Sequence, residues 1–506
     1  MGYAFFDLLW GARGLLSRRP ARAPSVPLRL YNTLSQEVEP FISLGGTVKM
    51  YNCGPTVYAA QTIGNLRGPL LANLLRRTFL TWGHYVRHVS NITDVGHLVS
   101  DSDEGEDKIE VQAKKEGLKA QDIAQHYTQL FFDDLDALGI ERSKIVWAPA
   151  TKYIAEQIAL VHTLEEKGYT YTIRDGVYFN TAKFPAYGRL GNINLEGQQA
   201  GARVEENKEK KNPHDFALWK FSQKYKEGGE KRQQQWRSPW GIGFPGWHLE
   251  CTAIIFTLLG KQIDVHMGGE DLIPIHHNNE IAQAEAATGK QFVKYWMHNA
   301  FITIEGKKIS KSLGNTVYLH NITDRGLSAQ SLRYWYLTAH YRTPMNFTWD
   351  AIAGADQALK RLNRSYLELS DTKALPRASA AAQTRGDGGF LRDFYEAIAN
   401  DLDTPRALAR MWELVRDPEI APGIKRASLA EADALLGLGF SKRRPAAKLK
   451  VIEESGMPQE VQELMRQRDE ARAAKNFTSA DLLREKIEAL GYELKDTPEG
   501  SEISKK

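Results

Sequence analysis

Residues 47–92 read TVKMYNCGPTVYAAQTIGNLRGPLLANLLRRTFLTWGHYVRHVSNI and contain the pattern that decides the fold. A strand-like run (47–52) leads into a turn at Cys53, a helical run from about Asn65 to Trp82, and a second strand-like run from His84. A helix between two strands indicates a βαβ unit with parallel pairing. Ligands of such sheets bind at the carboxyl ends of the strands, and Cys53 falls on that edge.

The same alternation returns later in the chain. We expect a helix from about residue 248 to 259, a strand at 262–267 and a helix at about 278–288. Both halves then belong to one parallel sheet, and the irregular stretch between them is an insertion. The fold class is therefore α/β: a Rossmann-type catalytic domain (28–330) interrupted by an inserted connective region at about 120–240.

The C-terminal half changes character beyond about Ser328, where apolar residues recur at helical spacing without strands. Such a pattern is typical of an all-α helical bundle. Two linkers rich in small or charged residues divide this half. We predict a junction segment at 331–372, a helical bundle at 373–456 and a helical tail at 457–506.

Composition excludes several classes of protein. The 506 residues are 42% hydrophobic and 25% charged, as in ordinary globular domains, and the formal net charge is only +4. No stretch approaches the roughly 18 apolar residues that a membrane span requires. Two cysteines do not make a disulfide-rich scaffold. The arginine-rich stretch 1–27 is expected to be a disordered extension, with an organelle transit peptide as the alternative.

The segment HHNNE (276–280) suggests a metal site. It starts a predicted helix, on which His276 and Glu280 are four residues apart and share a face. A lone pair of this kind is more often a surface pair. Zinc accepts Cys, His and carboxylate ligands, so Cys53 and Cys251 would complete a set if the sheet brings them to the same crevice. Sequence spacing alone does not establish this convergence.

Three strings containing these residues resemble one family: YNCGPTVY (51–58), GWHLECTA (246–253) and HMGGEDLIPIHHNNE (266–280) are similar to the zinc-site segments of cysteinyl-tRNA synthetases. The resemblance implies one Zn²⁺ per chain, bound by Cys53, Cys251, His276 and Glu280. Its expected task is to recognise the substrate thiolate, because shape discriminates poorly between cysteine and serine.

Two further segments are expected to serve ATP. GKKISKSLGN (306–315) carries Lys308 and Lys311 and resembles the KMSKS loop of class I synthetases, where ammonium groups neutralise the triphosphate. QTIGNLR (61–67) has Thr62 and Asn65 where the family usually has histidines. The resemblance also implies an ATP side formed by Gly64, Gly268, Gly269, Asp271 and Lys311, and a cysteine pocket formed by Thr93, Trp247 and His248.

The resemblance extends from about residue 28 to about residue 500. It implies that the protein activates L-cysteine with ATP and Mg²⁺ and transfers it to tRNA(Cys), with the bundle and tail reading the anticodon. We expect a cytoplasmic monomer without membrane contact; a transit peptide would place it in mitochondria. The alternatives are a cysteine:amino-sugar ligase and, because of Thr62 and Asn65, an inactive RNA-binding relative.

Overall fold

The structure is a computed structural model that describes residues 23–96, 107–193, 207–222, 232–310, 314–369, 387–440, 457–473, 476–497 and 500–505. Most of the arginine-rich extension lies outside these residues. The chain divides into two compact units, residues 1–439 and 440–506, which are described separately.

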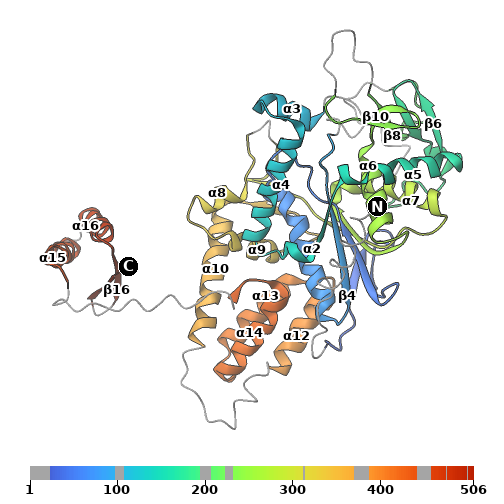
Figure 1. Ribbon diagram of the computed structural model, residues 1–506. Coiled ribbons are helices and arrows are strands. Elements are labelled where there is room, and N and C mark those ends of the chain that lie inside the picture. The colour runs from blue at the N-terminus through green and yellow to red at the C-terminus, as the bar shows by residue number, and fades with distance from the viewer. Residues whose placement is uncertain are drawn as a thin grey trace, which may run out of the picture. The chain divides into compact units, whose positions relative to one another are not determined.

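A five-stranded parallel sheet forms the centre of the first unit (Figure 1), with the strand order β12-β11-β3-β4-β5. Its strands are β3 (Thr47–Asn52), β4 (Tyr85–Ile92), β5 (Val146–Pro149), β11 (Ile263–Gly269) and β12 (Val293–Asn299). The chain builds outward from β3 in one direction and then returns to add β11 on its other side. The carboxyl ends of β3 and β11 therefore flank the switch point at which such sheets bind ligands.

Helices cover both faces of this sheet, with α2 on one side and α6 and α7 on the other (Figure 1). α2 (Ile63–Thr81) begins two residues before the predicted start and buries apolar side chains such as Leu66, Leu70 and Leu74. α6 (Trp247–Leu258) and α7 (Asn278–Thr288) follow the sequence prediction closely. The crossover from β4 to β5 contains α3 (Lys108–Glu116), α4 (Ala120–Ala137) and the short 3₁₀ turn η1 (Arg142–Lys144).

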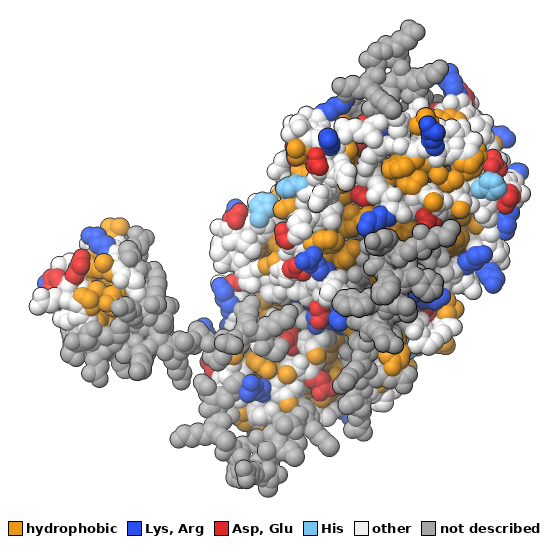
Figure 2. Space-filling view, viewed as in Figure 1, with side chains coloured by type: hydrophobic (Ala, Val, Ile, Leu, Met, Phe, Trp, Pro, Cys, Tyr) orange, Lys and Arg blue, Asp and Glu red, His pale blue; other side chains and the backbone are white. Residues whose placement is uncertain are grey.

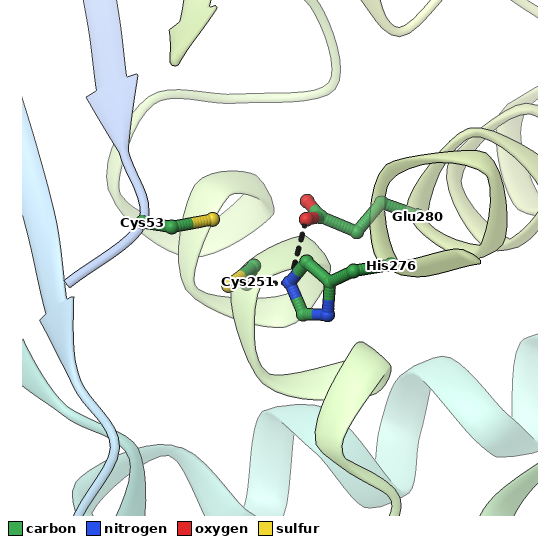
Figure 3. Close-up of side chains that lie close together, drawn as sticks. All are labelled: Cys53, Cys251, His276 and Glu280. Atoms are coloured by element: carbon green, nitrogen blue, oxygen red, sulfur yellow. Dashed lines mark hydrogen bonds and ion pairs between the residues drawn. The ribbon is translucent and has the colours of Figure 1, made fainter. Parts of the chain in front are cut away.

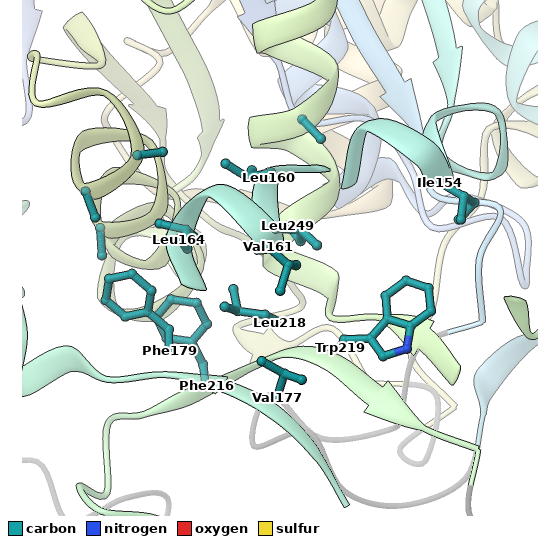
Figure 4. Packing of buried hydrophobic residues seen from close by; sticks show 14 of the residues in the cluster. Ile154, Leu160, Val161, Leu164, Val177, Phe179, Phe216, Leu218, Trp219 and Leu249 are labelled. Atoms are coloured by element: carbon teal, nitrogen blue, oxygen red, sulfur yellow. The ribbon is translucent and has the colours of Figure 1, made fainter. Parts of the chain in front are cut away.

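The predicted insertion contains a second, antiparallel sheet with the order β6-β7-β8-β10-β9. Its strands are β6 (Thr170–Ile173), β7 (Gly176–Phe179), β8 (Phe216–Phe221), β9 (Trp236–Ser238) and β10 (Gly241–Pro245). Figure 4 shows Phe179, Phe216 and Leu218 facing α5 (Ile154–Glu166) and α6. Fully burying one such side chain contributes about 1.5–3 kcal/mol, so this cluster ties the insertion to the helices that carry the site.

The remaining elements of the first unit form small sheets and helices. The strands are β1 (Arg29–Asn32), β2 (Glu37–Pro40), β13 (Ile302–Ile304), β14 (Lys307–Lys308) and β15 (Met345–Phe347). The α-helices are α8 (Leu319–Thr323), which has a single turn, α9 (Ala329–Leu337), α10 (Trp349–Glu368), α12 (Gly388–Ala399), α13 (Thr404–Arg416) and α14 (Pro422–Leu436). The short turns are η2 (Ala150–Tyr153), η3 (Thr181–Lys183), η4 (Glu270–Leu272) and the π-helical η5 (Ile273–His277).

A fully buried arginine on α9 ties the helical bundle to the catalytic half. Arg333 donates to the carbonyl oxygens of Leu436 (2.7 Å) and Leu138 (3.0 Å) and to Oδ1 of Asn73 on α2 (2.9 Å). No ion pair of Arg333 is present within the described ranges. Three neutral acceptors from different elements therefore hold one guanidinium, and through it α2, α4 and α14.

The second unit consists of α15 (Gln459–Ala473), α16 (Phe477–Ala489) and an antiparallel hairpin of β16 (Tyr492–Thr497) and β17 (Gly500–Lys505). The two helices agree with the predicted helical tail, but the hairpin was not predicted. Tyr492 and Ile503 on the hairpin pack in one buried cluster with Ile487 and Val461. The charged strands acquire their apolar contacts only from these helices, so local sequence gave little sign of them.

Among the described residues, no helix combines the length and the apolar composition that crossing a membrane requires. On the face drawn in Figure 2, basic and acidic side chains are interspersed among polar and apolar ones. This agrees with the small net charge of +4.

Candidate active site

A cavity of about 750 Å³ opens at the switch point between β3 and β11. This volume is within the range of ordinary ligand sites, about 300–1,000 Å³. Its wall includes residues from all the predicted segments: Cys53, Thr62, Gly64, Asn65, Thr93, Trp247, Cys251, Gly268, Gly269, Asp271, His276 and Lys308. The sheet therefore brings together segments that are up to about 250 residues apart in sequence.

The four predicted metal ligands come from three separate elements at one end of this cavity. Cys53 follows the last residue of β3, and Cys251 lies in the second turn of α6. His276 belongs to η5 and Glu280 to the first turn of α7, so the chain is helical through both. Their spacing of four residues places the imidazole and the carboxylate on one face, as predicted.

The ligand atoms of these four side chains all lie within 4.8 Å of one another (Figure 3). Nε2 of His276 is 3.7 Å from Sγ of Cys251 and 3.0 Å from Oε1 of Glu280. Cys251, His276 and Glu280 are buried, and Cys53 is partly exposed toward the cavity. The predicted convergence is therefore present. That the cluster binds zinc stays a prediction.

The electrostatics of the cluster favour a cation. Burial acts to raise the pKa of Glu280, but His266 and His276 lower it to about 2, so the carboxylate is ionised. Burial acts to lower the pKa of His276, yet contacts with Cys251 and Glu280 raise it to about 10. The hydrogen bond to Cys53, followed by burial, raises the pKa of the Cys251 thiol. Positive charge is thus stabilised at this place, and a divalent ion would supply it and lower the thiol pKa values.

One buried oxygen supports the same conclusion. Oε1 of Glu280 is buried and forms an ion pair with Nε2 of His276 at 3.0 Å, but it accepts no well-directed hydrogen bond. Buried oxygens without such a bond are rare, and a metal ion is one of the partners that satisfy them. Two sulfurs, one imidazole nitrogen and one carboxylate oxygen are also a donor set that Zn²⁺ accepts. The side chains therefore fit the metal that the resemblance implies.

Four further histidines surround the cluster. His248 and His276 have their Nδ1 atoms 2.9 Å apart, and Nε2 of His266 lies 2.9 Å from Oε2 of Glu280. Nε2 of His277 is 3.4 Å from Sγ of Cys53, while its Nδ1 is 2.7 Å from Nε2 of His298. Burial and the neighbouring imidazoles lower the pKa of His277 well below its usual value. Imidazole rings that contact ligand side chains in this way orient them for metal binding.

Sequence reasoning did not assign roles to His266 and His298. His266 lies on β11, the strand that leads toward η5, and His298 lies on β12, the edge strand of the sheet. Both side chains are buried. Histidine is unusual within a buried strand, since its ring nitrogens need partners. That signal was present at both positions but did not identify the partners.

The start of α2 forms another part of the wall. Thr62 precedes the helix, and Oδ1 of Asn65 accepts hydrogen bonds from the backbone nitrogen (3.0 Å) and from Oγ1 (2.7 Å) of Thr62. The two residues that replace the usual histidines thus stabilise each other. A Cβ on Gly64 would lie 2.9 Å from Cδ1 of Ile309. Glycine at this position therefore allows the segment that carries Lys308 and Lys311 (306–315, the lysine loop) to pack on the helix start through Ile309.

The lysine loop follows a hairpin between β13 and β14. Its turn has positive φ angles at Glu305 (49°) and Gly306 (75°), as hairpin turns with matching twist require. Asn315 braces the base of the loop: its Oδ1 accepts from the Ser310 nitrogen (2.9 Å) and its Nδ2 donates to the Lys308 carbonyl (3.0 Å). Lys308 is exposed in the cavity wall, whereas Lys311 lies outside the described residues.

The remaining predicted pocket residues occupy different positions. Trp247 lines the cavity with its ring 4.6 Å from that of His276. Oγ1 of Thr93 donates to Glu250 at 3.0 Å. His248 lies behind His276 and not in the wall. Gly268 and Gly269 end β11 and Asp271 follows it, and a Cβ on Gly268 would lie 2.7 Å from Cε1 of His277.

Lys108 and Phe301 are among the lining residues that were not predicted from the sequence. Lys108, the first residue of α3, lines the cavity with its Nζ 5.8 Å from the ring of Tyr58. Phe301, which follows β12, is 49% exposed in the same wall. Neither residue belongs to a recognisable motif, so only the folded chain places them there.

Comparisons with known proteins decide the family. Residues 41–357 match the family of class I (C) tRNA synthetase catalytic domains, and residues 454–502 match the cysteinyl-tRNA ligase anticodon binding domain. The chain belongs to the cysteinyl-tRNA synthetase family. The anticodon-domain match falls on the second unit and the catalytic match on the unit with the cavity.

Curated members of the cysteinyl-tRNA synthetase family are similar over nearly the whole chain. Cysteine–tRNA ligase 1 of Burkholderia lata is 44% identical, covering 94% of this chain and 97% of the relative. The cysteine–tRNA ligase of Thermus thermophilus is 43% identical, covering 94% and 98%. That of Treponema denticola is 39% identical, covering 93% and 98%.

Solved structures agree with this family at the level of the fold. Methionyl-tRNA synthetase of Mycobacterium tuberculosis, bound by methionyl-adenylate, has a TM-score of 0.51 at 14% identity, covering 78% of this chain and 90% of that one. A ternary LeuRS–tRNA–LeuAMS complex from Agrobacterium radiobacter has a TM-score of 0.56 at 12% identity, covering 86% of each chain. The predicted Rossmann-type fold with a helical C-terminal region is therefore confirmed.

Proposed function

We propose that this protein activates L-cysteine with ATP to form cysteinyl-adenylate and transfers the cysteinyl group to tRNA(Cys). One observation carries the proposal: three members of the metal cluster, Cys53, Cys251 and His276, line the same cavity as the start of α2 and Lys308. A thiol-selective site and a phosphate-binding site thus share about 750 Å³. The reaction needs both at once.

We assign the metal to Zn²⁺, one per chain, held by Cys53, Cys251, His276 and Glu280. The donor set, the buried oxygen of Glu280 that accepts no well-directed hydrogen bond, and the charge distribution support this assignment. Zinc bound there would accept the substrate thiolate as a further ligand, which an alcohol does far less well. Trp247 closes the cluster beside His276, and Thr93 is held by Glu250, so both side chains limit the space for the amino acid.

The start of α2 and the lysine loop are proposed to bind the triphosphate, with Mg²⁺ as part of the ATP substrate. Backbone N–H groups at a helix N-terminus bind phosphate oxygens. Since Oδ1 of Asn65 is used by Thr62, its amide N–H₂ group remains the donor toward a ligand. Lys308, and Lys311 beyond it, would neutralise the charge that develops as pyrophosphate leaves. Asp271, Gly268 and Gly269 are assigned to the adenosine side.

The second step requires the acceptor end of tRNA, whose terminal ribose hydroxyl takes the acyl group. The match of residues 454–502 to an anticodon binding domain supports a tRNA substrate and disfavours the amino-sugar ligase. We propose that the bundle α12–α14 and the second unit together contact the anticodon arm.

Cysteine-dependent exchange of pyrophosphate into ATP tests the first step, with zinc measured on the same sample. Exchange with cysteine but not with serine is expected. Zinc-loaded protein without exchange would refute the catalytic proposal and favour the inactive relative. Charging of tRNA(Cys) transcript, set against ligation of cysteine to an amino sugar, then separates the remaining alternatives. We further propose a cytoplasmic monomer, which sedimentation and cell fractionation would check.

A further inference from the structure

Asp401, in the turn between α12 and α13, connects three parts of the first unit. Its Oδ1 accepts from the Tyr31 backbone nitrogen (2.8 Å) and from the Tyr341 hydroxyl (2.7 Å). Its Oδ2 accepts from Nε of Arg342 (2.8 Å), and its carbonyl oxygen accepts from Nε2 of His340 (2.8 Å). A single aspartate of the bundle thus holds β1 and residues 340–343 of the junction segment.

The turn that presents Asp401 is itself held rigidly. Asp401 and Leu402 both have positive φ angles, 55° and 57°. This conformation is costly for leucine and persists only where surrounding contacts impose it. Here the nitrogen of Asp401 donates to the Arg29 carbonyl and that of Leu402 to the Ile398 carbonyl, each at 3.0 Å. Asp401 therefore has a defined position relative to both the bundle and β1.

Residues 340–343 of the junction segment in turn accept hydrogen bonds from Arg67 of α2. Nη2 of Arg67 donates to the carbonyl oxygens of His340 (3.2 Å) and Thr343 (2.9 Å). Its Nη1 donates to the carbonyl oxygens of Ala300 (2.7 Å) and Phe301 (3.3 Å). The guanidinium is buried, so these carbonyls are the groups that compensate for its lost hydration.

Arg67 is close in sequence to one residue of the cavity wall, and two of the residues whose carbonyl groups it binds belong to that wall. Arg67 lies two residues after Asn65, in the first turns of α2, and Asn65, Ala300 and Phe301 all line the cavity. No described contact joins Arg67 or Asp401 to the cluster of Cys53, Cys251, His276 and Glu280. If residues 340–343 moved, Arg67 and residues 300–301 would move with them. This would change the ATP side of the cavity and leave the cysteine side in place.

We propose that Asp401 is a positioning residue for adenylate formation, which acts through the 340–343 backbone and Arg67 on the start of α2 and on residues 300–301. We call these contacts the Asp401–Arg67 relay. The inference rests on the proposed function, since it assigns a way in which the helical bundle sets the geometry of the reaction. A ligand that moves the bundle, such as tRNA, would act on the cavity along the same contacts.

A double-mutant cycle in pyrophosphate exchange tests the relay. The variants are Asp401→Asn, Arg67→Lys and the double variant. Asp401→Asn keeps the shape of the side chain and removes its charge. Arg67→Lys keeps the charge and removes the planar guanidinium, whose two terminal nitrogens donate to separate carbonyl groups. Each single variant is expected to lower kcat about tenfold with KM for cysteine unchanged, because geometry is lost on the ATP side alone. Substitutions that act through the same backbone segment do not have additive effects. The double variant should therefore also lose about tenfold in kcat, and not about a hundredfold.

The matched control is Asp387→Asn, since Asp387 caps α12 in the same bundle, accepting from the Phe390 nitrogen, and has no contact with residues 340–343 in the described part of the chain. It should leave kcat unchanged. A hundredfold loss in the double variant, or equal kcat for Asp401→Asn and Asp387→Asn, overturns the relay. Thermal unfolding and zinc content establish that each variant is folded.

If Asp401→Asn does not fold, Tyr341→Phe replaces it, because it removes the hydroxyl that donates to Oδ1 at 2.7 Å and keeps the ring. It should lower kcat about threefold alone and have no effect in the Arg67→Lys background, as expected for a shared route. A threefold effect in both backgrounds overturns the relay. Wild-type protein without cysteine-dependent exchange refutes the proposed function instead, so the two failures are distinguishable.

Discussion

Replacing His248 tests whether the ring behind His276 supports metal binding. If Nε2 of His276 binds the ion, its Nδ1 carries the proton and donates to Nδ1 of His248, 2.9 Å away. His248→Phe removes this acceptor in a buried site, and leaving a buried donor unpaired costs about 1–3 kcal/mol. Zinc affinity should therefore fall about 10- to 100-fold, the range known for residues that orient metal ligands.

The assay is competition for zinc against a chelator of known affinity, followed by pyrophosphate exchange at saturating zinc. His248→Gln offers an amide oxygen as an acceptor and should recover part of the affinity. His320→Phe, an exposed position on α8, is the matched control and should bind zinc as wild type does. If folded His248→Phe protein binds zinc as tightly as wild type, the hydrogen bond does not orient His276 and the reasoning fails.

Four further predictions follow from other parts of the structure. Cys251→Ser should lose zinc and cysteine activation together; retention of metal with normal rejection of serine would contradict the assignment. Lys308→Ala and Lys311→Ala should keep their zinc and slow adenylate formation about 100-fold, which single-turnover kinetics would measure. Arg333→Leu leaves three buried acceptors without a donor and should lower the free energy of unfolding by about 3 kcal/mol in urea titrations. Burial raises the pKa of Asp134 to about 6 from its usual 3.8, so the native state binds more protons and the protein gains stability as pH falls from about 7 to 4; Asp134→Asn should remove this contribution in thermal unfolding.

Much of the fold was predictable because its central elements have strong local patterns. β3 and α7 begin and end where the hydrophobic periodicity and the closing Gly289 indicate. The hairpin of the second unit was missed for the opposite reason. Its strands are mostly polar or charged, and two of their few apolar residues, Tyr492 and Ile503, are buried in the cluster that includes residues of α15 and α16.

The candidate site divides in the same way. His276 and Glu280 lie four residues apart on a helix, so their shared face was predictable from spacing. The positions of Lys108 and Phe301 were not, since each depends on how a distant element crosses the sheet edge. The contacts of Asp401 with Tyr31 and Tyr341 span 370 and 60 residues, and no local pattern marks them.

By itself, the sequence determined the βαβ pattern, the residue types of the metal cluster and the resemblance to one family. These depend on short-range periodicity and on strings of neighbouring residues. Only the tertiary structure decided that Cys53 and Cys251 lie beside His276 and Glu280. It also decided that the bundle is connected to the cavity wall through residues 340–343 and Arg67. The physical reason is that such contacts depend on the order in which strands pair and helices pack, which the free energy of the whole fold selects.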